Sequence, residues 1–326
     1  MKPQVAPFRA AWWCRGPHCQ TLWPHIVRLR PRVKLRRERW ELPDGDFIDV
    51  DWHDDAHELD DDAGMVLLLH GLEGSSRSGY ARGLLKALRA RNWHGAIMHF
   101  RGCSGEPNRL ARSYHSGETA DLRYAISELR RRFPARKLAV VGYSLGGNVL
   151  LKYLGESRSN ANIDAAVAVS VPFDLAKASA RLNRGASRLY QWKLLNSLRR
   201  NARRKFARIE ADFVMPELSR LNCFREFDHS VTAPLHGFSS AEDYYTQSSS
   251  RQYLPAIAAP TLILQARDDP FMTPDAMPLV SEASATTRLE IYAHGGHVGF
   301  VGGSWPWAAE YWLESRIPAF LAEFIA

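Results

Sequence analysis

The residues GYSLG at 142–146 match the G-x-S-x-G pattern, in which a serine hydroxyl is held ready to act as a nucleophile. Residues 138–143 form an apolar run typical of a buried strand, and residues 146–156 have the spacing of a helix. Glycine two positions before and after the serine allows strand and helix to approach closely. We therefore predict that Ser144 lies on a strained turn with its hydroxyl exposed.

A serine hydroxyl is a weak nucleophile unless a histidine takes its proton and a carboxylate orients that histidine. Residues 260–271, PTLILQARDDPF, predict a strand that runs directly into Asp268 and Asp269. The acid of such a site usually lies a few residues beyond the strand, which favours Asp269. Asp268 would then support the turn or face solvent.

Two histidines, His294 and His297, follow in a glycine-rich loop before the last helical segment. The resulting order of serine, acid and histidine is that of serine hydrolases built on a strand–turn–helix motif. A strand predicted to end near residue 293 leaves His294 at its edge. Glycines at 295 and 296 permit the sharp return toward Ser144, so we predict His297 as the base.

An oxyanion that forms at Ser144 would need two N–H donors. The N–H of Leu145 is one candidate, because it lies at the N-terminus of the predicted helix. The second donor should come from the loop after an earlier strand, in the sequence LLLHGLEGSS, where the N–H of Leu72 is the best placed. We expect His70 in this loop to be a structural residue at the strand end rather than a base.

Strands alternate with helices along most of the chain, which predicts an α/β fold with a mostly parallel central sheet and helices on both faces. The acidic segment 54–64 is expected to be a solvated connection, and four prolines should break any long element before residue 30. Strands are predicted within residues 32–42, 43–53, 65–74, 95–105, 137–144, 163–173, 260–271 and 288–297, and helices within 79–93, 117–133, 146–156 and 305–325.

Residues from about 174 to 250 do not follow this alternation. They begin with a basic, helix-like segment, 181–208, which contains ten Lys/Arg and no Asp/Glu. A loop-rich stretch follows before the next predicted strand. An insertion of this length in a regular α/β pattern predicts a cap or lid on a single domain that spans residues 1–326.

The composition predicts a soluble, cytoplasmic protein. No apolar run approaches the ~20 residues that cross a bilayer, and the first residues lack the apolar segment of a secretory signal. Cys14 and Cys19 are close in sequence, whereas Cys103 and Cys223 stand apart. This spacing fits neither a zinc site nor a disulfide scaffold, so we predict reduced thiols.

The chain resembles the α/β-hydrolase superfamily, and within it the YheT-like group (the AB hydrolase 4 family), which is related to mammalian abhydrolase-domain esterases and lipases. The resemblance implies a triad of Ser144, Asp269 and His297 and the hydrolysis of carboxylic esters with short, medium or lipid-like acyl groups, without a metal or organic cofactor. The family often has leucine where this chain has Cys19. The motifs that carry the resemblance are PHCQTLWP, HGLEGSSRSGYARGL, HFRGCSGEPNRLARSYHSGETADL, VVGYSLGGNVLLKYLGE, FREFDHSVTAPLHGFSSAEDYY, ARDDPFM and HGGHVGF.

Two other interpretations remain open at this point. The same triad would serve an acyltransferase or a thioesterase. The net charge of +8 and the basic segment 181–208 would alternatively suit a non-catalytic protein that binds anionic lipid, or a peripheral membrane contact of the enzyme. No nucleic-acid motif accompanies the basic segment, so we expect no nucleic acid as a partner.

Overall fold

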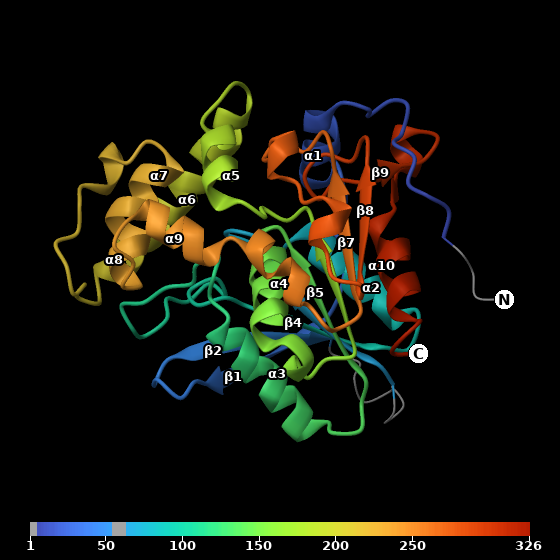
Figure 1. The fold of residues 1–326 in the computed structure, drawn as a ribbon, viewed down its shortest axis with the longest axis horizontal. Helices are drawn as coiled ribbons and strands as arrows, with labels where there is room; N and C mark the ends of the chain where they lie inside the picture. The colour runs from blue at the N-terminus through green and yellow to red at the C-terminus, as the bar shows by residue number, and fades with distance from the viewer. Residues whose placement is uncertain (1–4, 54–62) are drawn as a thin grey trace.

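A computed structural model describes residues 5–53 and 63–326, and Figure 1 shows its fold. In this part of the chain, eight strands form one sheet in the order β1-β2-β4-β3-β5-β6-β7-β8. The pairs β1·β2 and β2·β4 are antiparallel, and all other neighbours are parallel. The strands are β1 (Leu35–Glu41), β2 (Phe47–His53), β3 (Met65–Leu69), β4 (His94–Met98), β5 (Leu138–Tyr143), β6 (Ala165–Val169), β7 (Thr261–Ala266) and β8 (Thr287–Tyr292), with a separate pair of β9 (Val301–Gly302) and β10 (Glu310–Tyr311).

The predicted mostly parallel sheet with helices on both faces is confirmed. Alternate residues of β3 show the two layers: Val66 and Leu68 pack toward α2 and α10, whereas Leu67 and Leu69 pack toward α3 and α4. All these side chains are fully buried, as expected for a strand covered on both faces. The helices of these layers are α2 (Gly79–Arg89), α3 (Ala120–Arg132), α4 (Leu145–Ser157) and α10 (Leu313–Leu321).

A group of helices lies between β6 and β7 in the sequence and gathers on one side of the molecule (yellow to orange in Figure 1). It has its own apolar cluster, in which Leu195 of α6 packs with Phe224 and Phe227 of α7. The basic segment 181–208 is mostly α6, so its predicted helix is confirmed. These helices are α5 (Leu175–Leu182), α6 (Ser187–Phe206), α7 (Phe224–Phe227), α8 (Ala233–Leu235) and α9 (Ala241–Ser248).

Three local predictions differ from the structure or lie outside it. The first residues contain α1 (Pro17–Ile26), since Pro17 occupies the first helical turn, where a proline has no N–H bond to lose. The predicted closing helix is shorter than residues 305–325, because Pro306 begins a separate turn and α10 starts only at Leu313. The acidic connection lies almost wholly in residues 54–62, outside the described residues. No described helix has the length and apolarity that crossing a membrane requires.

The prediction of reduced thiols is wrong for one pair, because a disulfide joins Cys14 to Cys19. Their Cα atoms are 5.4 Å apart, a normal separation for a disulfide. The turn before α1 and the first turn of that helix bring the two sulfur atoms together locally. A single disulfide between two cysteines that are close in sequence is neither a zinc motif nor a scaffold of several disulfides. The prediction from sequence rested on those two arrangements alone. Cys103 and Cys223 are free thiols.

Candidate active site

Ser144 lies on the turn between β5 and α4, where the sequence predicts it. Its φ of 53° and ψ of −119° place it in a positive-φ conformation that costs a non-glycine residue roughly 1–3 kcal/mol. Glycines on either side permit this turn. A Cβ atom on Gly142 would lie 2.4 Å from the carbonyl oxygen of Gly146, and one on Gly146 would lie 2.6 Å from that of His70. The strained turn therefore depends on both glycines.

The structure brings Ser144, His297 and Asp269 into one hydrogen-bonded line. Nε2 of His297 lies 2.9 Å from Oγ of Ser144, and Nδ1 of His297 lies 2.8 Å from Oδ2 of Asp269. These residues follow β5, β8 and β7, whose carboxyl ends meet at the same edge of the sheet. In this arrangement the carboxylate fixes the imidazole with Nε2 facing the serine hydroxyl.

The loop after β7 holds the carboxylate of Asp269. Its side chain is fully buried, and Oδ1 accepts a 2.8 Å hydrogen bond from the N–H of Phe271. The ring of Phe271 stacks on the imidazole of His297, with centroids 3.8 Å apart and planes at 4°. This stacking covers one face of the histidine and restricts its orientation.

Asp268 and His294 form a separate pair outside this line. Oδ1 of Asp268 accepts a 2.9 Å hydrogen bond from the N–H of Gly296, and Oδ2 lies 3.4 Å from Nδ1 of His294. Burial raises the pKa of Asp268, while His294 is exposed. Asp268 thus supports the turn that carries His297, and it does not contact that imidazole in the structure.

Sequence analysis missed the contribution of α1 to the site. Oγ1 of Thr21 accepts a 2.9 Å hydrogen bond from the N–H of His297. The neighbouring Gln20 is fully buried, and its side chain bonds both the N–H and the carbonyl of Val301. Both residues belong to the motif PHCQTLWP, so the signal was present, but nothing in the motif itself indicated that it braces the histidine loop.

The loop after β3 lies directly against Ser144. A Cβ atom on Gly71 would lie 3.2 Å from Cβ of Ser144, which places the following residue, Leu72, beside the serine. Leu145 is the first residue of α4, so its N–H has no acceptor within the helix. His70 is fully buried and accepts a hydrogen bond from the N–H of Phe100, and burial lowers its pKa to about 3. Its contacts are those of a neutral structural residue.

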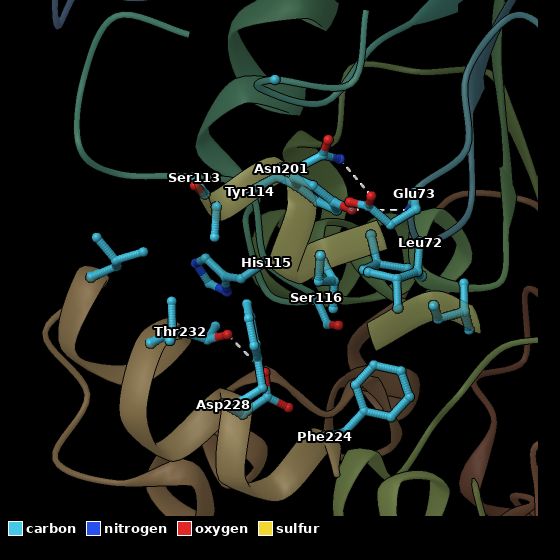
Figure 2. Close-up of a pocket in the computed structure, with 18 of the residues that line it drawn as sticks. Leu72, Glu73, Ser113, Tyr114, His115, Ser116, Asn201, Phe224, Asp228 and Thr232 are labelled. Atoms are coloured by element: carbon cyan, nitrogen blue, oxygen red, sulfur yellow. Dashed lines mark hydrogen bonds between the residues drawn. The ribbon is translucent and has the colours of Figure 1, made fainter. Parts of the chain in front are cut away.

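The side chain of Glu73 links this loop to the helices above the sheet edge. Its backbone has a φ of 56°, and its carboxylate accepts hydrogen bonds from the hydroxyl of Tyr114 (2.9 Å), Oγ of Ser197 (2.6 Å) and Nδ2 of Asn201 (2.6 Å). Figure 2 shows the bonds from Tyr114 and Asn201 converging on this carboxylate beside Leu72. Ser197 and Asn201 belong to α6, so one carboxylate fastens that helix to the loop next to Ser144.

A cavity of about 180 Å³ opens at Ser144 and runs between the sheet edge and α5–α9. Its polar wall includes Asp228, which accepts hydrogen bonds from Thr232 (2.7 Å) and Tyr245 (2.8 Å). Burial raises the pKa of Asp228 to about 6 and lowers that of Lys205 to about 7. Much of the remaining wall is apolar, including Leu72, Leu145, Leu175, Leu182, Leu194, Leu198, Phe206, Phe224, Phe227, Val231 and Leu235.

One group of side chains in the described residues has the composition of a metal site. His115, Glu118 and His236 offer ligand atoms within 4.8 Å of one another. However, Arg112 already pairs with Glu118, and the N–H of Gly117 donates to Nδ1 of His115, which leaves the proton of that neutral ring on Nε2. Burial lowers the pKa of both histidines, to about 3 and about 2. The contacts fit two packed neutral imidazoles beside an ion pair better than a cation site.

Comparisons with known proteins agree with this geometry. Residues 64–304 match the family described as alpha/beta hydrolase fold. YheT of Escherichia coli (strain K12), which is named as a candidate esterase, is 44% identical over 310 residues, or 94% of this chain and 91% of that protein. Phospholipase ABHD3 of Mus musculus is 29% identical over 305 residues, or 92% of this chain and 74% of that protein. An esterase structure from Pyrococcus furiosus superposes with a TM-score of 0.57 at 18% identity, covering 90% of this chain and 92% of that one.

The chain belongs to the α/β-hydrolase family and, within it, to the YheT-like group. The resemblance drawn from its motifs is therefore confirmed. Its class is that of a hydrolase of the esterase and lipase type.

Proposed function

We propose that the protein is a serine hydrolase that cleaves carboxylic esters through an acyl-enzyme on Ser144. The observation that supports this most strongly is the line from Ser144 through His297 to Asp269, with both contacts under 3 Å, at the opening of a largely apolar cavity. This line has the composition and spacing that nucleophilic catalysis by serine requires.

In this proposal, His297 takes the proton of Ser144 as its Oγ attacks the ester carbonyl. The N–H groups of Leu72 and Leu145 stabilise the oxyanion, and the protonated His297 then gives its proton to the departing alcohol. Water enters next and transfers a proton to the same histidine, and its oxygen attacks the acyl carbonyl. Collapse of the second oxyanion releases the acid and returns the proton to Ser144, while Asp269 remains ionised and holds the imidazole throughout.

The cavity supports an ester with an apolar acyl group as the substrate. Leucine and phenylalanine side chains of α5–α7 line much of it, and such a wall favours hydrocarbon over charged groups. Relatives named as an esterase and as a phospholipase are consistent with lipid-like esters. We further propose that residues 174–250 act as a cap whose packing determines the acyl length.

Transfer of the acyl group to an alcohol or cleavage of a thioester would use the same residues. Hydrolysis results when water reaches the acyl-enzyme first, and acyl transfer results when an added alcohol does. We also propose the cytoplasmic location that the sequence predicts. Reducing compartments disfavour a disulfide such as Cys14–Cys19, so this location and that disulfide oppose each other.

A series of p-nitrophenyl esters of increasing acyl length tests the proposed function. The wild-type protein should hydrolyse them with a maximum at the length that fills the cavity. Ser144→Ala should lower turnover by roughly 10⁴-fold or more and retain the unfolding temperature of the wild type. Retention of near-wild-type turnover by this variant would refute the acyl-enzyme proposal.

A further inference from the structure

Exposed apolar side chains gather on one part of the surface. Single exposed apolar residues are normal, but a cluster of them marks an interaction site. On α1 and just beyond it, Leu22, Ile26, Val27 and Leu29 are exposed, and Leu29 is 92% accessible. In the described residues, every exposed large hydrophobic side chain except Val214, Leu279 and Val280 belongs to α1 and the residues just after it, to the start of α6, or to a group of tryptophans.

Side-chain contacts connect these three segments. The exposed Trp12 packs edge-to-face against Trp305, with ring centroids 5.7 Å apart, and Trp305 stacks on Trp307. The next residue, Trp13, contacts Trp23 of α1 at 4.5 Å, so the tryptophans continue into that helix. The tryptophans and α1 therefore form one surface.

The start of α6 joins this surface through a hydrogen bond. Nδ1 of His18 in α1 lies 2.9 Å from the hydroxyl of Tyr190 in α6. Leu189 and Trp192, on either side of Tyr190, are exposed, and Trp192 is 66% accessible. We call the surface formed by residues 17–30, residues 188–193 and the exposed tryptophans 12, 305 and 307 the docking face.

The segments that form the docking face carry charged side chains of one sign. Residues 1–37, 175–209 and 303–309 contain no Asp or Glu. Arg30, Arg188 and Lys193 are exposed within these segments. An anionic lipid surface attracts each such cation by about 1 kcal/mol, and Trp and Leu side chains partition into its interface.

The docking face also lies close to the candidate active site. The ring of Tyr190 packs against Phe271 at 5.1 Å, and Phe271 stacks on His297. Only the ring of Phe271 therefore lies between Tyr190 of the docking face and the proposed base. Thr21 of α1 bonds the backbone of His297 directly. A membrane under this face would therefore lie near the loop that carries His297.

We propose that the docking face binds the protein to anionic lipid surfaces, from which it takes its ester substrate. The partner is a lipid bilayer, because the face combines exposed tryptophan and leucine with the exposed cations Arg30, Arg188 and Lys193. The docking face differs from the basic segment 181–208 in two ways. It includes only the start of α6, and it adds α1 and the exposed tryptophans. The C-terminal half of α6 is engaged elsewhere: Lys205 is buried, and Arg204 donates to the carbonyl of Gly105. The inference rests on the proposed function only for the identity of the substrate.

Sedimentation of the full chain with vesicles tests docking without any turnover. Vesicles of phosphatidylcholine and phosphatidylglycerol in equal parts should bind the wild type, and vesicles of phosphatidylcholine alone should bind it far less. Binding should fall when salt rises from about 0.1 M to about 0.5 M, because screening weakens the attraction. Arg188→Gln and Lys193→Gln should each lower the partition coefficient about fivefold.

The double variant Leu29→Ser with Trp192→Ser should lower the partition coefficient about tenfold or more. Val214→Ser is the matched control, since Val214 is 94% accessible but lies among acidic residues of another loop, and it should bind like the wild type. All of these variants should keep wild-type turnover of a water-soluble ester.

Two vesicle results would overturn the docking proposal: equal binding to both vesicle types, or an equal loss of binding in the Val214→Ser control. A third contradicting result would be that the wild type does not bind vesicles and instead forms a dimer, which the double variant converts to monomer. The last would assign the face to a second copy of the chain. If the proposed function alone is wrong, no ester is cleaved but vesicle binding and its dependence on these variants persist.

Discussion

The sheet edge and the helices α5–α9 contribute to the same cavity in different ways. The edge presents Ser144, Asp269 and His297 on loops that each follow a strand directly, so sheet pairing fixes their relative positions. The helices contribute a packed wall that includes the titratable groups Asp228 and Lys205. The groups proposed for bond cleavage thus follow from strand order, whereas the groups proposed to select the substrate follow from helix packing.

The largest effect expected at the sheet edge is the loss of the base. His297→Ala should lower ester turnover by roughly 10⁴-fold or more, because Ser144 then has no proton acceptor. His294→Ala is the matched control: its imidazole is exposed and contacts Asp268, so turnover should change little. Equal losses in the two variants would contradict the role of His297 as the base, because they would show that either substitution acts by disturbing the loop.

A somewhat smaller loss is expected for the carboxylate. Asp269→Asn should lower turnover by about 10³- to 10⁴-fold, because the imidazole loses the group that fixes its tautomer. Asp268→Asn should cost far less, since Asp268 bonds the backbone of the loop and not the imidazole. Steady-state kinetics of both variants decide the matter, and a larger loss in Asp268→Asn would reverse the assignment.

The sequence predicts the sheet edge better than it predicts the packing of the helices. The GYSLG turn, the strand before Asp269 and the glycines before His297 are local patterns, so sequence analysis places them, and the structure brings those residues together. The brace from Thr21 is separated from His297 by 276 residues and follows no periodicity. The pairing of Glu73 with α6 depends on how that helix packs, which no local pattern records.

Glu73 links the loop after β3 to α6, so its substitution tests how the sheet edge and the helices α5–α9 depend on each other. Glu73→Gln should lower kcat by about tenfold to a hundredfold with little change in KM, because the adjacent Leu72 N–H loses its fixed direction toward the oxyanion. Asn201→Ala removes only one donor to this carboxylate and should cost less. Glu217→Gln is a control on the exposed surface of the same helical region. A change in KM alone would assign Glu73 to substrate binding instead.

The smallest effect concerns stability in the helical region. Burial raises the pKa of Asp228 from 3.8 to about 6, so its proton is bound more tightly in the folded state than in the unfolded state. The stability that this group contributes is fully present below pH ~4 and is lost as pH rises through about 6, by about 3 kcal/mol in total. Asp228→Asn should remove this slope. Chemical unfolding of both proteins between those pH values measures the difference, and parallel stability curves would contradict the prediction.

If Ser144 carries the acyl group, that intermediate can be trapped. A slowly deacylated ester is mixed with the protein, the reaction is quenched in acid, and the peptide that contains Ser144 is analysed by mass spectrometry. We expect an added acyl mass on Ser144 that is absent in His297→Ala. Catalysed ester turnover without an acyl adduct on Ser144, or with the adduct on another residue, would contradict the acyl-enzyme proposal.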